Sequence, residues 1–276
     1  MYYLRCELPD HSIWTIAHAG HEIPENSAGL SQLPGLQENP DLYSLEANIQ
    51  HKIDFIKNYI DPSKTEVTLV GHSVGCKIVL DIMKSEVLDF KMGCMLFPMI
   101  ERMYETPAGK RTWKLVHYFP QLVTILAWIL SFIPHSLMRP FLSSWMNCFS
   151  QKPCGIDNKM SETNVKAIEK LIDAKVVKHI FHLAQTEFPN VRDADYETIV
   201  KYSEKLKFYY GCDDDWAPRQ YYDELVAKVP NLHAEYGSCD NKIPHAFVLW
   251  SSESIAKKVA NWILHPEENF EMRKTQ

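Results

Sequence analysis

The sequence predicts an α/β protein with a mainly parallel sheet flanked by helices and a helical, strongly apolar insertion. Strands and helices alternate along the chain, which is typical of a parallel sheet covered on both faces. More than a hundred residues separate a strand at 92–97 from the next at 206–210, and that gap is too long for a simple crossover. We therefore expect one domain over residues 1–276 with a helical insertion at 104–200.

The first part of the chain predicts a strand, a helix and a second strand. Residues 12–17 form a short apolar run that indicates a buried strand leading into a loop. Between 44 and 60, apolar residues recur every three or four positions, which is the pattern of an amphipathic helix, and an Asp-Pro pair ends it. A compact β-branched run at 66–70 predicts the next strand, and a helical pattern follows at 76–84.

The remaining elements continue the alternation. The strands at 92–97 and 206–210 are closed by a proline and a glycine. After them we expect a helix at 219–229, a weak strand at 232–236, a last helix at 251–264 and a polar tail at 270–276.

Composition is that of a packed globular protein. Hydrophobic residues make up 46% of the chain and charged residues 23%, far from the disordered and fibrous classes. The 29 basic and 35 acidic side chains give a net charge of −6, which excludes a basic nucleic-acid binder.

The cysteines and the hydropathy pattern favour a reduced, intracellular setting. The seven cysteines form no Cys-x-x-Cys pair, and residues 1–9 carry no secretory signal. No run of about 20 apolar residues occurs, which argues against a conventional membrane-spanning protein.

A candidate nucleophile lies between the second strand and its helix. Residues 71–75 read Gly-His-Ser-Val-Gly, a Gly-x-Ser-x-Gly pattern whose turn lifts the serine hydroxyl above the sheet edge. The pattern alone is also met in ordinary glycine-rich turns. Because a buried strand precedes it and a helix follows it, we interpret Ser73 as a nucleophile.

A serine nucleophile needs a histidine base and a carboxylate, which follow it in that chain order as acid and then histidine. Three aspartates occupy 213–215 after a predicted strand, and their spacing from Gly211 and Pro218 selects Asp214. An acidic turn without catalytic function is the alternative. His245 is the one histidine in a loop between the last strand and the last helix, so it is the candidate base.

Other groups of the site are less completely specified. The backbone N–H of Val74 is the expected first donor of an oxyanion hole, and the loop at 18–20 is a possible second source. We expect His72 to pack beside the sheet. His18 and His21 supply two ligands without a third, so no metal site is predicted, and no cofactor is implied.

Five stretches resemble the lipid droplet-associated hydrolase family of the α/β-hydrolases. They are Trp-Thr-Ile-Ala-His-Ala-Gly-His at 14–21, Gly-His-Ser-Val-Gly at 71–75, Leu-Phe-Pro-Met-Ile-Glu-Arg-Met at 96–103, Phe-Tyr-Tyr-Gly at 208–211 with Trp216 and Pro218, and Asn-Lys-Ile-Pro-His-Ala-Phe at 241–247.

The resemblance implies a serine hydrolase of lipid esters, with sterol esters the leading substrate, on lipid droplets and the endoplasmic reticulum, acting in lipid storage. It assigns Ser73, Asp214 and His245 as nucleophile, acid and base. Family members begin with further strands and a Gly-Asn-Pro-Gly type loop that supplies the oxyanion hole. The sequence therefore resembles an N-terminally shortened form, with an exposed sheet edge expected.

The insertion is dense in large apolar side chains between 113 and 146. Its central run at 122–130 is too short to span a bilayer, so one interpretation is a buried lid helix over the site. The other is a lid that also inserts into a phospholipid monolayer, as a peripheral or monotopic segment. The candidate membrane or lid residues are Trp113, Leu126, Trp128, Ile129 and Trp145.

Two rival functions stay open at the level of sequence. One is a lipid-surface protein with the same fold and little or no catalysis. The other is an acyltransferase or thioesterase, since the triad does not specify which group accepts the acyl chain. The expected partners are a lipid ester and a droplet or membrane surface, without nucleic acid.

Overall fold

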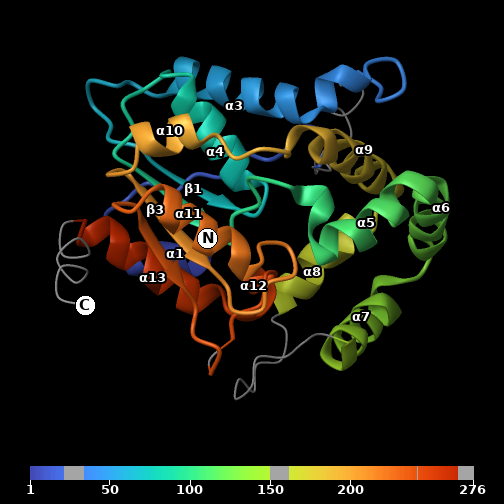
Figure 1. The fold of residues 1–276 in the computed structure, drawn as a ribbon. Coiled ribbons are helices and arrows are strands. Elements are labelled where there is room, and N and C mark those ends of the chain that lie inside the picture. Colours follow the sequence, from blue (N-terminus) through green and yellow to red (C-terminus); the bar gives the residue numbers. More distant parts are fainter. Residues whose placement is uncertain (22–33, 150–161, 241, 267–276) are drawn as a thin grey trace.

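The computed structural model describes residues 1–21, 34–149, 162–240 and 242–266 of the 276-residue chain (Figure 1). A parallel sheet lies at its centre, with the strand order β1-β2-β3-β4. The strands are β1 (Thr68–His72), β2 (Met92–Leu96), β3 (Leu206–Tyr210) and β4 (His233–Tyr236). Because all four run the same way, the loops that follow them meet at one edge of the sheet.

The two faces of the sheet are both buried. Every residue of β2 and β3 is buried, as expected for central strands of a parallel sheet. Side chains alternate between faces, so Met95 and Phe208 pack into one core cluster while Cys94 and Tyr209 pack into another. The sheet therefore separates two hydrophobic layers.

Helices cover each layer. Helices α3 (Leu45–Tyr59) and α4 (Gly75–Lys84) lie on one side of the sheet, and α1 (Tyr2–Glu7) and α13 (Ser252–Leu264) lie on the other (Figure 1). The short helix α12 (Phe247–Trp250) directly precedes α13. Three-layer packing of this kind confirms the predicted fold class, a mainly parallel sheet flanked by helices.

Between β2 and β3 the chain is helical. This segment contains η2 (Met103–Glu105), α5 (Pro107–Tyr118), α6 (Pro120–Leu130), α7 (His135–Phe149), α8 (Glu162–Leu171), α9 (Ala174–Asn190) and α10 (Tyr196–Lys201). Helices α5, α6 and α7 extend along one side of the molecule, away from the sheet (Figure 1). The remaining elements are η1 (Pro40–Tyr43) before α3 and α11 (Arg219–Lys228) between β3 and β4.

Local sequence explains where several helices begin. The Ser44 hydroxyl accepts the backbone N–H of Ala47 at the start of α3, and Thr106 accepts that of Gly109 at the start of α5. Proline at the first position of α5 and α6 is compatible with a helix start because its missing N–H is not needed there.

One predicted strand is wrong. Residues 12–17 form no strand in the structure, and Trp14 is largely exposed. An apolar run predicts which residues favour burial, but a strand also requires a hydrogen-bonding neighbour. Within the described residues, β1 pairs only with β2, so the run at 12–17 has no ladder to join. The predicted tail at 270–276 lies outside the described residues.

In the part of the chain that the structure describes, no helix is both long enough and apolar enough to cross a membrane.

Candidate functional site

The turn between β1 and α4 presents Ser73 in a left-handed backbone conformation, with φ of 56°. The Ser73 N–H donates to the Leu96 carbonyl at 3.0 Å, and its carbonyl accepts the N–H of Met99 at 3.1 Å, so β2 and the chain after it hold the turn. Gly71 is required here, because a Cβ on it would lie 2.7 Å from the Gly75 carbonyl oxygen. The turn is thus a strained serine elbow.

Ser73, His245 and Asp214 form a continuous hydrogen-bonded chain. His245 Nε2 lies 2.9 Å from Ser73 Oγ, and His245 Nδ1 lies 2.7 Å from Asp214 Oδ2. The Asp214 side chain is 1% exposed and that of His245 18%. The three side chains come from loops after β1, β3 and β4, which end at the same sheet edge. This arrangement can transfer a proton from the serine hydroxyl to the imidazole.

The three consecutive aspartates have three different environments. Asp214 is buried, and its Oδ1 accepts the Trp216 N–H at 2.8 Å. Asp213 pairs with Lys242, and Asp215 pairs with Arg111 at 2.6 Å; both of these aspartates are exposed. Only Asp214 lies against His245, as the spacing from Gly211 and Pro218 predicts.

His72 contacts the backbone of the histidine loop. Its Nε2 lies 2.9 Å from the His245 carbonyl oxygen, and its ring packs edge-on against Phe97 and Phe247. Burial, with repulsion from His245 next, lowers the pKa of His72 to about 4. The ring is therefore neutral near pH 7, and Nε2 must carry the proton that it donates to the carbonyl. The sequence predicts this ring beside the sheet, but no sequence pattern indicates the hydrogen bond.

The two candidate oxyanion donors differ in their surroundings. Among the described residues, no acceptor takes the Val74 backbone N–H, which sits directly after Ser73. In the loop at 18–20, by contrast, the Ala19 N–H donates to Asn48 Oδ1 at 2.9 Å. The Ala19 N–H is thus already hydrogen-bonded to a side chain of α3, whereas the Val74 N–H is available to donate to an oxyanion.

His18 and His21 lie beside a buried lysine. His18 Nδ1 is 3.4 Å from Lys52 Nζ, and the two histidine rings contact each other edge-on. Burial, then repulsion from Lys52, lowers the pKa of His18 to about 4, and burial lowers that of Lys52 to about 8. In the described ranges no three His, Cys, Asp or Glu side chains gather as a metal site would require.

The predicted lid and membrane residues do not share one environment. Leu126, Trp128 and Ile129 of α6 are 48–55% exposed. Trp113 is half-buried, stacked on His117 and packed against Phe188. The side chain of Trp145 lies outside the described residues.

Two surface cavities of about 340 and 570 Å³ are both lined by the half-buried Arg102. Neither is lined by Ser73, Asp214 or His245.

One cysteine pair departs from the expected reduced state. Cys212 and Cys239 form a disulfide, with Cα atoms 5.3 Å apart, whereas Cys6, Cys76 and Cys94 are free. The two partners are 27 positions apart in sequence and meet because β3 and β4 are neighbours. Spacing along the chain therefore gave no indication of the bond.

Comparison with known proteins agrees with this architecture. Residues 2–248 match the family described as lipid-droplet associated hydrolase. The chain is 34% identical to the lipid droplet-associated hydrolase of Drosophila melanogaster, covering 94% of this chain and 81% of the relative. It is 28% identical to that of Homo sapiens, covering 90% and 74%.

Solved structures show the same fold at low identity. A 2-hydroxy-6-oxo-6-phenylhexa-2,4-dienoate hydrolase from Rhodococcus matches with a TM-score of 0.52 at 14% identity, covering 80% of this chain and 73% of that one. A hydrolase from Oleispira antarctica matches with a TM-score of 0.51 at 14% identity, covering 96% and 85%. With its α/β-hydrolase fold, the chain belongs to the lipid droplet-associated hydrolase family.

Proposed function

We propose that this lipid droplet-associated hydrolase is a serine carboxylic-ester hydrolase that cleaves lipid esters through an acyl-enzyme on Ser73. The observation that carries the proposal is the position of His245, within hydrogen-bonding distance of both Ser73 Oγ and Asp214 Oδ2. A serine hydroxyl is a weak nucleophile near pH 7, and a histidine at this distance removes its proton as it attacks.

The reaction follows from these contacts. His245 Nε2 takes the Ser73 proton while Oγ attacks the ester carbonyl, and Asp214 stabilises the imidazolium through Nδ1–H. The Val74 N–H donates to the oxyanion of the tetrahedral intermediate. His245 then protonates the leaving alcohol. In the second half, His245 activates a water that releases the acyl group and frees Ser73.

The substrate we propose is a water-insoluble lipid ester, with sterol esters such as cholesterol esters first, in cellular lipid storage. The family resemblance supplies this preference. The molecule's surface supports a lipid-bound substrate in general, because α6 exposes several large apolar side chains instead of burying them. A soluble substrate would not need such a surface.

We propose that residues 104–200 act as a lid and that α6 also enters the phospholipid monolayer of the droplet or of the endoplasmic reticulum. Of the eleven residues of α6, only Ala127 is buried. Leu126, Trp128 and Ile129 are exposed, and neighbouring Phe132 and Phe141 are more than half exposed. Apolar helices with tryptophan lie in membrane interfaces.

The chemistry is tested by timing the reaction of the purified chain with a fluorophosphonate probe. We expect labelling that disappears in Ser73→Ala and persists in Ser252→Ala, a matched control at a half-buried serine that begins α13. A folded chain without Ser73-dependent labelling would contradict the proposal and favour a non-catalytic surface protein. If Ser73 is labelled, the products formed from cholesteryl oleate and triolein are then analysed. Reactions with and without an acceptor alcohol or thiol separate hydrolysis from acyl transfer.

The surface attachment is tested by flotation with artificial droplets made of triolein and phosphatidylcholine. Replacing Leu126, Trp128 and Ile129 by serine should reduce binding about a thousandfold or more, because each lost side chain contributes roughly 1.5–3 kcal/mol when fully buried in lipid and about 1.4 kcal/mol corresponds to a factor of ten. The matched control is Val200→Ser, an exposed apolar residue of α10. Unchanged flotation of the α6 variant would contradict the attachment while leaving the ester chemistry untouched.

A further inference from the structure

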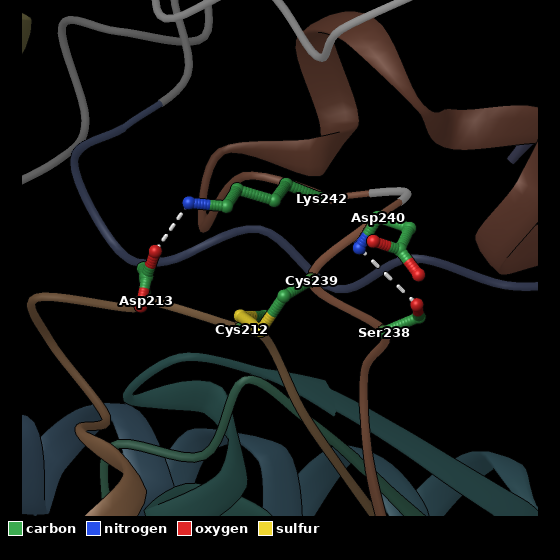
Figure 2. Close-up of a disulfide and its surroundings, with 6 residues drawn as sticks. All are labelled: Cys212, Asp213, Ser238, Cys239, Asp240 and Lys242. Carbon is green, nitrogen blue, oxygen red and sulfur yellow. Dashed lines mark hydrogen bonds and ion pairs between the residues drawn. A yellow bond between two sulfur atoms is a disulfide. The ribbon is translucent and has the colours of Figure 1, made fainter.

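A covalent bond joins the two loops that carry Asp214 and His245. Cys212 follows β3 and precedes Asp214 by two residues, and Cys239 follows β4 and precedes His245 by six. Figure 2 shows their disulfide crossing between the two loops. The bond therefore joins the two loops at points between their strands and the residues Asp214 and His245.

We propose that Cys212 and Cys239 are positioning residues for His245, and that thiol–disulfide exchange at their bond controls the reactivity of Ser73. This inference rests on the proposed ester hydrolysis. With the bond formed, His245 lies within hydrogen-bonding distance of both Ser73 and Asp214. Reduction releases the histidine loop from the acid loop and displaces the imidazole from that geometry.

Apart from the contact between Asp214 and His245 itself, the other ties between these loops are weaker. The Gly237 N–H donates to the Tyr210 carbonyl at 2.7 Å, which fixes the end of β4 but not the loop beyond it. Asp213 and Lys242 form an ion pair next to the disulfide (Figure 2), but both side chains are exposed, and such pairs contribute little. The ladder between β3 and β4 does not depend on the disulfide, so reduction should loosen the loops without unfolding the sheet.

The two cysteines differ in solvent exposure, which determines the sulfur atom that a reductant attacks first. Cys239 is exposed, whereas Cys212 is 5% exposed. A thiolate of a dithiol reductant, of the thioredoxin type, attacks Cys239 Sγ, and Cys212 leaves as a thiolate and takes up a proton. The second thiol of the reductant then attacks the mixed disulfide and releases Cys239. The reductant loses two electrons and two protons and becomes a disulfide, while the protein gains two thiols.

Of the three free cysteines among the described residues, Cys6 is exposed and the other two are buried. Cys76 and Cys94 are fully buried, and burial raises the pKa of Cys94 to about 12. Such thiols do not exchange readily. Disulfides inside mesophilic cells are usually catalytic or redox-sensing and not structural. At the proposed droplet location, a reducible bond two residues from Asp214 fits a redox-sensing function.

The experiment compares oxidised and dithiothreitol-reduced portions of the full chain. The bond is read by maleimide labelling and mass spectrometry, Ser73 reactivity by the fluorophosphonate probe, and the fold by circular dichroism. We expect reduction to slow labelling about ten- to a hundredfold, because a displacement of ~1 Å can cost on the order of a hundredfold. Reoxidation with oxidised glutathione should restore the rate.

Variants separate this bond from other thiols. Cys212→Ser combined with Cys239→Ser should label at the slow rate with or without dithiothreitol. Cys6→Ser, at an exposed free cysteine, should behave as the parent chain does. If the double variant fails to fold, the reversible rate change of the parent chain decides the question.

Failure of the redox inference can be distinguished from failure of the proposed ester hydrolysis. Equal labelling rates in the oxidised and reduced chain, or a bond that dithiothreitol does not open in the folded chain, would overturn this inference and leave the ester chemistry intact. No Ser73-dependent labelling in the oxidised chain would overturn both.

Discussion

The central strands of the sheet bury their apolar residues, whereas helix α6 leaves most of its own exposed. All five residues of β3 are buried, whereas only one of the eleven residues of α6 is buried, although α6 is the more apolar segment. Burying the apolar side chains of the sheet stabilises the fold and fixes the loops that hold Ser73, Asp214 and His245. Those of α6 stay available for another surface. The stability of the fold therefore depends on the sheet, whereas the proposed surface attachment depends on α6.

The largest loss of turnover is expected for Asp214→Asn, at the sheet edge where the proposed catalytic residues meet. The amide holds the wrong tautomer of His245, and turnover should fall about 10⁴-fold, as in other serine triads. Asp215→Asn is the matched control, since Asp215 is exposed and pairs only with Arg111. The measurement is kcat on a soluble ester such as p-nitrophenyl butyrate. Equal losses in both variants would mean that the triad assignment is wrong.

A pair of truncations tests the two regions by stability. Phe208 of β3 is fully buried, so Phe208→Ala should lower the free energy of unfolding by about 3–5 kcal/mol. Trp128 of α6 is 55% exposed, and Trp128→Ala should change it by less than about 0.5 kcal/mol. Urea denaturation followed by circular dichroism measures both. A large loss in Trp128→Ala would show that α6 stabilises the fold after all.

The sheet was the most predictable part of the chain. The strand at 206–210 was predicted at its observed bounds, because a fully buried strand has a continuous apolar pattern with a glycine after it. The strand predicted at 66–70 is observed at Thr68–His72, because the elbow turn begins only at Ser73 and the ladder with β2 continues through His72. The run at 12–17 was wrong, because sequence does not indicate which neighbour would pair with it.

The meeting of the three proposed catalytic residues at one place was predictable for a topological reason. Each of Ser73, Asp214 and His245 follows a parallel strand, and the carboxyl ends of parallel strands meet at one sheet edge. The disulfide and the contact between His72 and the His245 carbonyl were not predictable in this way. Both depend on how neighbouring loops approach each other, which no local pattern encodes.

The helical segment contains a buried carboxyl group, which gives a pH-dependent test. Glu187 of α9 is 8% exposed, and burial raises its pKa from 4.5 to about 7. The folded chain thus keeps a proton that the unfolded chain releases near pH 4.5. The resulting stability, about 3 kcal/mol, is fully present below pH 4.5 and is lost as pH rises through 7.

Glu187→Gln should remove this pH dependence of stability. The free energy of unfolding of the variant, relative to that of the parent chain, should therefore increase between pH 5 and 8. The matched control is Glu197→Gln, at an exposed position of α10. Urea denaturation at four pH values across this range measures the difference. A parent chain whose stability does not fall relative to Glu187→Gln over this range would contradict the raised pKa.

The smallest expected effect concerns His72, which connects the buried sheet edge to the more exposed histidine loop. His72→Phe keeps a ring against Phe97 and Phe247 but removes the N–H that donates to the His245 carbonyl. A lost neutral hydrogen bond corresponds to about 1 kcal/mol, so kcat should fall roughly five- to tenfold with KM unchanged. His72→Gln retains a donor and should recover most of the loss. Because the pKa of His72 is about 4, its contribution to kcat should be constant from pH 6 to 9. A higher kcat in His72→Phe than in His72→Gln would mean that the ring, and not the hydrogen bond, positions His245.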